Sequence, residues 1–147
     1  MALRIVPDII HGQDAATVPP GLSARDTAAI MAQRRIGAIM VVDNDKLVGI
    51  CSERDITYKV VAKGLNPDTV TIAEIMTANP VTIAPDATPE AALQAMRKIN
   101  ARHLPVVSGP EIIGILSIRD LYAAIAAKLE DDLAERDSYI TGRAYTG

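Results

Sequence analysis

The chain has 147 residues, 49% of them apolar, and a formal net charge of -3. This length and apolar content are typical of one globular domain with its own core, and the acidic balance argues against nucleic acid as the main partner. The single cysteine, Cys51, excludes an internal disulfide, and no apolar run approaches the ~18 residues that a membrane helix needs.

The first residues, Met1 to Arg4, do not have the pattern of a signal peptide. We therefore expect a protein of the reducing cytoplasm, where a lone cysteine stays a thiol. Because the chain carries no second kind of domain, we expect it to stand alone and to act on a separate partner.

The first 65 residues predict one β-α-β-β-α unit, from apolar periodicity, turn residues and helix caps. The expected elements are a helical turn at 6–10, a brief strand at 16–18, a helix from Ala24 to about Arg35, a hairpin of strands at 38–42 and 46–50, and a helix from Glu53 to about Ala62.

The second half repeats the first at an offset of 65 residues, without a gap. The stretch Gly49-Ile50-Cys51-Ser52-Glu53-Arg54-Asp55 returns as Gly114-Ile115-Leu116-Ser117-Ile118-Arg119-Asp120. Two copies are too few for a solenoid, so we expect them to bury a face against each other in one pseudo-symmetric domain. The expected elements are a turn at 72–76, a strand at 81–83, a helix from Pro89 to about Asn100, strands at 103–107 and 111–116, and a helix from Ile118 to Leu129 or beyond.

The last residues, 130–147, continue the final helix with a highly charged surface, and we expect 140–147 to fray. A solvated helix end is the favoured interpretation, and a contribution to a dimer contact is the alternative.

The motif Gly-apolar-x-Ser-x-x-Asp at each last strand–helix junction resembles that of the cystathionine-beta-synthase (CBS) domain. The stretches Ile36-Gly37-Ala38-Ile39-Met40-Val41-Val42-Asp43 and Arg102-His103-Leu104-Pro105-Val106-Val107 resemble the second-strand signature of the same family. The resemblance runs from about Val6 to Leu129. It implies an α/β (α+β) fold in which two β-α-β-β-α CBS repeats, at 6–65 and 70–129, pack about a pseudo-two-fold axis as one Bateman module.

The family also implies a homodimer and small adenosine-containing ligands in the clefts between repeats. The expected ligand is AMP, ADP or ATP, with NAD(H) and S-adenosylmethionine as alternatives. Acidic side chains suit the ribose hydroxyls, and hydroxyl and basic side chains suit the phosphates. The predicted ribose ligands are Asp55 and Asp120, and the predicted phosphate ligands are Ser52, Arg54, Ser117, Arg119, Arg102 and His103. The predicted wall for the base is Thr17, Val18, Ile39, Thr82, Ile83 and Leu104.

Two interpretations of each Ser-x-x-Asp remain open. The pair is also an ordinary N-cap, in which the serine accepts a backbone N–H and the acid suits the helix dipole. In addition, Arg102-His103 occupies the positions that Gly37-Ala38 holds in the first copy. We therefore expect unequal clefts, with the one around Ser117 and Asp120 taking the more phosphorylated ligand or binding it more tightly.

The leading hypothesis is a ligand-sensing regulatory module that signals to an unidentified effector protein by a change of conformation. The alternative is a dimerisation or scaffold protein with vestigial clefts. We expect no enzyme, because His11 and His103 stand in unrelated contexts and Cys51 lacks the sequence signature of a nucleophile. No catalytic cofactor and no metal site are expected.

Overall fold

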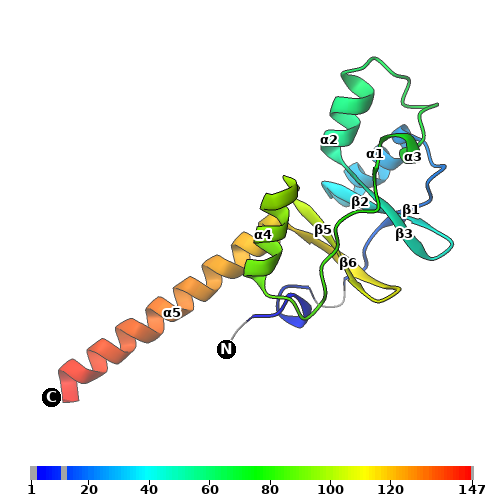
Figure 1. Cartoon of the computed structure of the whole chain (residues 1–147). Helices are drawn as coiled ribbons and strands as arrows, with labels where there is room; N and C mark the ends of the chain where they lie inside the picture. Colours follow the sequence, from blue (N-terminus) through cyan, green and yellow to red (C-terminus); the bar gives the residue numbers. More distant parts are fainter. Residues whose placement is uncertain (1–2, 11–12, 147) are drawn as a thin grey trace.

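The computed structural model describes residues 3–10 and 13–146, and side chains as far as Asp137. The strands form two sheets, one with the order β1-β2-β3-β4 and one made of β5 and β6. Helices accompany each sheet, and the long α5 leaves the body and projects away from it (Figure 1). This is the mixed α/β fold that the pattern predicts.

The first repeat follows the predicted order. Its elements are β1 (Thr17–Val18), α1 (Ala24–Arg34), β2 (Ala38–Asp43), β3 (Lys46–Ser52), α2 (Glu53–Ile56) and the π-helix η2 (Thr57–Val61). Ser23 caps α1, its Oγ accepting the backbone N–H of Asp26 at 3.1 Å. The β2–β3 hairpin turns through Asn44 and Asp45, both at positive φ, as a two-residue turn between twisted strands requires.

The second repeat has α4 (Pro89–Ile99), β5 (His103–Ser108), β6 (Glu111–Ser117) and α5 (Ile118–Thr146). The two hairpins share one register, since Ala38 pairs with Ser52 and His103 pairs with Ser117. Both hairpins also shift register at the same place, between Val41 and Val42 and between Val106 and Val107. The sequence repeat is therefore a structural repeat.

Two predicted elements differ from the structure. The strand expected at 81–83 is reduced to one bridge, in which Ile83 N donates to Pro105 O and Ile83 O accepts from Val107 N, both at 3.0 Å. The final helix continues unbroken to Thr146, in place of the frayed tail expected at 140–147.

The segment that precedes each repeat packs on the other repeat. The π-helix η1 (Ile5–Ile9) contributes Ile5 to the core of the second repeat, and Ile5 N donates to Ala87 O at 3.0 Å. The helix α3 (Ile72–Ile75) contributes Ile72 and Ile75 to the core of the first repeat, and β4 (Thr77–Ala78) adds the last strand to its sheet. We expected helical turns at both places, but their exchange between repeats was not predicted.

Gly49 and Gly114 are equivalent glycines of the two repeats, and each lies beside the chain that follows one of these exchanged segments. A Cβ on Gly49 would overlap Sδ of Met76, and a Cβ on Gly114 would overlap Oε1 of Gln13. The Gln13 amide accepts from the N–H of Ile115 at 2.7 Å and donates to its carbonyl at 3.1 Å. The Gln13 side chain thus hydrogen-bonds to the edge of β6, in the way that the backbone of β4 pairs with β3 in the first repeat.

Each repeat has its own apolar core, which contains no Phe or Trp because the chain has none. Ile39 and Val41 lie in the first core and Leu104 and Val106 in the second, all at most 1% exposed. These core contacts hold the two hairpins in place, and the residues of the candidate site lie at the ends of their strands.

Candidate functional site

Ser52 and Asp55 form a complete capping box at the start of α2. The backbone N–H of Ser52 donates to Oδ2 of Asp55 at 2.9 Å, and the backbone N–H of Asp55 donates to Oγ of Ser52 at 3.3 Å. The Ser52 hydroxyl also donates to Oδ2 at 3.2 Å. The capping interpretation of this motif is therefore confirmed.

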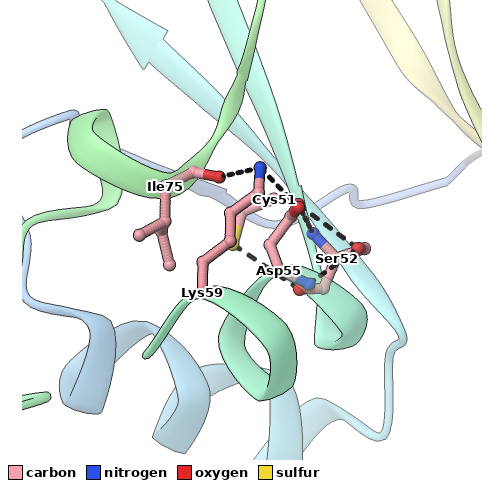
Figure 2. A network of polar contacts seen from close by, with 5 residues as sticks. All are labelled: Cys51, Ser52, Asp55, Lys59 and Ile75. Carbon is pink, nitrogen blue, oxygen red and sulfur yellow. Dashed lines mark hydrogen bonds and ion pairs between the residues drawn. The ribbon is translucent and has the colours of Figure 1, made fainter. Parts of the chain in front are cut away.

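The second carboxylate oxygen of Asp55 faces Lys59. Figure 2 shows Nζ of Lys59 between Asp55 and the carbonyl of Ile75, with 3.0 Å to Oδ1 and 2.8 Å to the carbonyl oxygen. The Asp55 side chain is 14% exposed and that of Lys59 is 41% exposed. Lys59 therefore ties the first Ser-x-x-Asp motif to the end of α3, which leads into β4.

The second motif is capped but differently surrounded. The N–H of Ser117 donates to Oδ2 of Asp120 at 3.3 Å, and the N–H of Asp120 donates to Oγ of Ser117 at 3.1 Å. Asp120 is exposed, and Ala124 stands where the first repeat has Lys59. The two carboxylates are equivalent in sequence position but not in environment.

A cavity of about 460 Å³ opens beside the first motif, between the two repeats. Its polar side is formed by Ser52, Arg54 and Asp55 from the β3–α2 junction. The opposite side comes from β4 and the segment after it, and from the end of α4 and the start of β5. The apolar side chains that line the cavity are Ile50, Tyr58, Pro80, Val81, Ile99 and Pro105.

A second cavity, of about 530 Å³, is lined by helices α1, α2 and α5. Ala28, Met31 and Ala32 line it from α1, and Ser117 and Arg119 line it from the β6–α5 junction. Arg35 and Arg102 bring the number of arginines in its wall to three. Asp120 is not part of the lining of either cavity.

Four residues, Gly37, Glu53, Arg102 and His103, line both cavities. The absence of a side chain at Gly37 makes room there, because a Cβ would lie 3.3 Å from Cε1 of His103 and 3.4 Å from Oε1 of Glu53. Arg102 and His103 were predicted to share the cleft of the second copy with Ser117 and Arg119; they line one cavity together with these two residues, and they also line the cavity beside Asp55. Their bulk is accommodated because the equivalent residues are Gly37 and Ala38.

Burial lowers the pKa of His103 below its ordinary value of 6.5. The carboxylates of Glu53 and Asp120 partly oppose this shift, and the nearby Arg102 guanidinium adds to it. The surroundings of His103 therefore favour the neutral imidazole. Burial, with the negative charge of Asp55, likewise raises the pKa of the Cys51 thiol to about 12.

The residues predicted to hold the base do not line these two cavities. Ile39, Leu104 and Val18 are buried in the cores, Ile83 packs partly against the second core, and Thr17 and Thr82 are exposed. Among the lining residues that were missed, Val81 is next to Thr82, and Tyr58 lies three residues after Asp55 on the same helical face. That spacing is a signal from which Tyr58 could have been found.

In the described ranges 3–10 and 13–146, no helix is long and apolar enough to cross a membrane. No group of three or more His, Cys, Asp and Glu that could hold a metal ion occurs in this described part either. His11 lies outside the described residues.

The model of the CBS domain family matches the chain twice, at residues 7–62 and 72–127. The CBS domain-containing protein CBSCBSPB3 of Arabidopsis thaliana is 39% identical over 114 residues, which are 76% of this chain and 20% of the plant protein. The CBS domain-containing protein YhcV of Bacillus subtilis is 34% identical over 106 residues, 72% of this chain and 75% of that protein. The chain thus spans about a fifth of the length of CBSCBSPB3.

Solved structures agree over a larger share of the chain. A candidate signal-transduction protein with CBS domains from Burkholderia ambifaria has a TM-score of 0.80 at 32% identity, over 85% of this chain and 95% of that one. The CBS domain pair of protein MJ0100, solved with 5′-methylthioadenosine and S-adenosyl-L-methionine, has a TM-score of 0.77 at 28% identity, over 87% and 99%. A hexameric CBS-CP12 protein from bloom-forming cyanobacteria has a TM-score of 0.76 at 27% identity, over 83% and 71%.

Proposed function

The chain belongs to the CBS domain family and contains a tandem pair of these domains, and from this premise we propose that it is a regulatory module that binds an adenosine-containing nucleotide. The proposed site is the 460 Å³ cavity beside Asp55. The bound ligand would change the conformation of the module, and a separate effector protein would respond to that change.

The lining of the cavity supports this proposal. A volume of about 460 Å³ lies within the range of ordinary small-molecule sites, which combine apolar walls with a few polar groups. Ile50, Val81 and Ile99 offer an apolar slot for the base, and Asp55 offers carboxylate oxygens for the ribose hydroxyls. Ser52 and Arg54 offer donors for a phosphate.

The MJ0100 relative adds support for the ligand class. Its CBS pair was solved with two molecules that share an adenosine part, and it matches this chain over 87% of the length. AMP, ADP and ATP are the ligands that we propose here, because Arg54 and Arg102 on this cavity suit phosphates. NAD(H) and S-adenosylmethionine stay as alternatives.

A ligand could act through Asp55. The Asp55 carboxylate is already engaged by Ser52 and Lys59, so a ribose that binds it must share or replace these contacts. Lys59 in turn holds the carbonyl of Ile75 at the end of α3, and Thr77 and Val81, just beyond, line the same cavity. Ligand binding shifts such an arrangement only if the two states differ in affinity for the ligand.

The remaining expectations belong to the same proposal. We propose a homodimer, unequal clefts with the more phosphorylated ligand near Ser117 and Asp120, and no catalytic activity. The base-wall assignment to Thr17, Val18, Ile39, Thr82, Ile83 and Leu104 stays a prediction. In the Asp55 cavity, Val81, Ile99 and Tyr58 are better placed to contact the base than those six residues, because they line the cavity.

The test is a thermal-shift screen of the protein with a panel of adenosine ligands. A ligand that binds only the folded state adds about 2.7 kcal/mol of stability at a hundredfold excess over its dissociation constant. We expect a shift that Asp55→Ala removes and that Asp43→Ala, an exposed hairpin control, leaves intact, while Asp120→Ala tests the separate cleft near Ser117. If no adenosine ligand shifts the transition, the two Ser-x-x-Asp motifs are helix caps only, and the scaffold function replaces this proposal.

A further inference from the structure

The cleft beside Asp120 is bordered by different side chains from the cavity beside Asp55. Val81, Ile99 and Tyr58 line the Asp55 cavity, and they are 45%, 40% and 62% exposed. A flat base packs well on apolar and aromatic side chains of this kind. The offset of 65 residues gives each of the three an equivalent in the other cleft. These equivalents are, in the same order, Ala16, Arg34 and Ala123. Two small side chains and one cation therefore replace the apolar surface.

Arg34 and Ile99 have the same place in their repeats. Arg34 is the last residue of α1 and Ile99 is the last residue of α4. Each is followed by a residue in the left-handed conformation, with φ of 56° after Arg34 and 53° after Ile99. Because the two helix ends share this geometry, an arginine stands where the other cleft has an apolar side chain.

The Arg34 side chain reaches the opposite element of its cleft. Its Nη1 donates to the carbonyl oxygen of Asp14 at 3.4 Å. Asp14 is the equivalent of Asn79, which lines the 460 Å³ cavity together with Ile99. In one repeat these two elements border a cavity, whereas in the other a hydrogen bond joins them. Ala16, two residues after Asp14, packs partly against the core of the first repeat. The position equivalent to the base slot is thus taken by an arginine.

The 530 Å³ cavity beside Ser117 is suited to phosphates. Its lining contains three arginines and one acid, Glu53, which leaves two positive charges when His103 is counted as neutral. The lining of the 460 Å³ cavity contains two arginines and two acids, which balance. Guanidinium groups donate paired hydrogen bonds to phosphate oxygens. The arginines of the 530 Å³ cavity are Arg35, Arg102 and Arg119.

We propose that the cleft beside Ser117 and Asp120 recognises a chain of phosphates and is indifferent to the base, because Arg34 occupies the position of the base. This inference rests on the proposed function, and it names the ligand class of the second cleft. The phosphates belong to a nucleoside triphosphate, whose base stays in solvent, or to an inorganic polyphosphate. Both present the same chain of negative charges to the arginines. Adenine is distinguished from other bases in the Asp55 cavity, so one adenosine is bound per chain.

The first test titrates each cleft separately by calorimetry. Adenosine, which has no phosphate, is expected to bind the wild type with one molecule per chain. In Asp55→Ala, ATP and GTP are expected to bind with dissociation constants within about threefold of each other, and inorganic tripolyphosphate is expected to compete with both. Arg119→Gln should weaken tripolyphosphate binding about tenfold, the effect of one charged hydrogen bond. Arg97→Gln, an exposed arginine outside both cavities, is the matched control.

The outcomes separate this inference from the proposed function. Two adenosines per chain, a larger preference for ATP over GTP in Asp55→Ala, or no binding of tripolyphosphate overturns the inference. Wild type saturated with adenosine gives the tripolyphosphate result without a substitution, should Asp55→Ala fail to fold. If tripolyphosphate binds in a manner that depends on Arg119 but adenosine does not bind, the proposed function of the Asp55 cavity fails and the phosphate cleft stands.

The second test concerns Arg34 itself. Arg34→Ile gives the second cleft the residue that the first has at position 99, and Gln33→Ile adds the same side chain at an exposed neighbour that lines neither cavity. In the Asp55→Ala background, Arg34→Ile is expected to raise the affinity for ATP relative to tripolyphosphate by at least about threefold, because the base gains an apolar contact. Gln33→Ile should leave this ratio unchanged. An unchanged ratio in Arg34→Ile contradicts the role of Arg34.

Discussion

Nζ of Lys59 lies 3.0 Å from Oδ1 of Asp55, one helical turn away, and the equivalent aspartate, Asp120, faces Ala124 at that position. One motif of the repeat is therefore linked to the inter-repeat segment through Lys59 and Ile75 O. The other motif caps its helix from an exposed position. The same sequence motif therefore has different surroundings in the two repeats.

The two aspartates are expected to differ in their contribution to stability. Asp55→Ala loses a capping contact and an ion pair, which together are worth about 1–2 kcal/mol. Asp120→Ala loses an exposed cap alone, and we expect about 1 kcal/mol or less. Urea unfolding of both variants checks this difference. Lys59→Met should lower the cost of Asp55→Ala, and equal costs in both backgrounds would exclude the coupling.

Gly114 is expected to depend on Gln13. Gly114→Ala pushes a methyl group against the Gln13 amide and displaces it from its two hydrogen bonds with Ile115, so we expect a loss of about 1–2 kcal/mol. In a Gln13→Ala background, the added methyl group keeps only an ordinary contact with Cγ2 of Ile10, at 3.6 Å, and costs less. A double-mutant cycle measured by chemical denaturation gives this coupling energy. Strict additivity would show that the glycine is needed for a different reason.

His103 is expected to make stability depend on pH near neutrality. Its folded pKa lies below the ordinary 6.5, so the unfolded chain binds the proton more readily. The free energy of unfolding therefore falls as the pH falls through about 6.5 and levels off below the folded pKa. His103→Gln should flatten the difference between pH 7.5 and pH 5.5. A nuclear magnetic resonance titration of His103 that gives a pKa above 6.5 would reverse the sign.

Cys51 is expected to be chemically inert in the folded protein. With its pKa at about 12, only a minute fraction of the thiol is ionised at pH 8, and the side chain is fully buried. We expect its reaction with a disulfide reagent to follow global unfolding, so that the rate rises with urea. A rapid reaction in native buffer, with the fold intact by circular dichroism, would contradict the buried placement.

The elements within each repeat were predictable because local signals specify them. Ser23 and Thr88 cap helices, Asn44 and Asp45 turn a hairpin, and the 65-residue offset places each signal twice. The exchange of η1 and α3 between repeats was not predictable. It depends on long-range packing of Ile5 and Ile72 against different cores, which no local pattern encodes.

The same limit applies to the candidate site. Ser52, Arg54 and Asp55 were identified because a motif names them, and the structure brings them to one cavity. Arg102 and His103 were placed on one cleft, because sequence does not reveal that Gly37 leaves room for them at the boundary of two cavities. The partners Val81 and Ile99 come from the other repeat, so only the tertiary fold reveals them.

The segments η1 and α3 precede one repeat but pack on the other. The repeated stretch of sequence is therefore not the same as the unit that folds cooperatively. A fragment ending at residue 65 would keep Ile5 but lose Ile72, Ile75 and the β4 strand, whereas one starting at residue 70 would carry them beside the wrong sheet. We therefore expect that neither half folds alone and that the two fold together. In a permuted chain, η1 would follow α5. Each core would then be built from one continuous half of the chain, provided the new linker spans the gap.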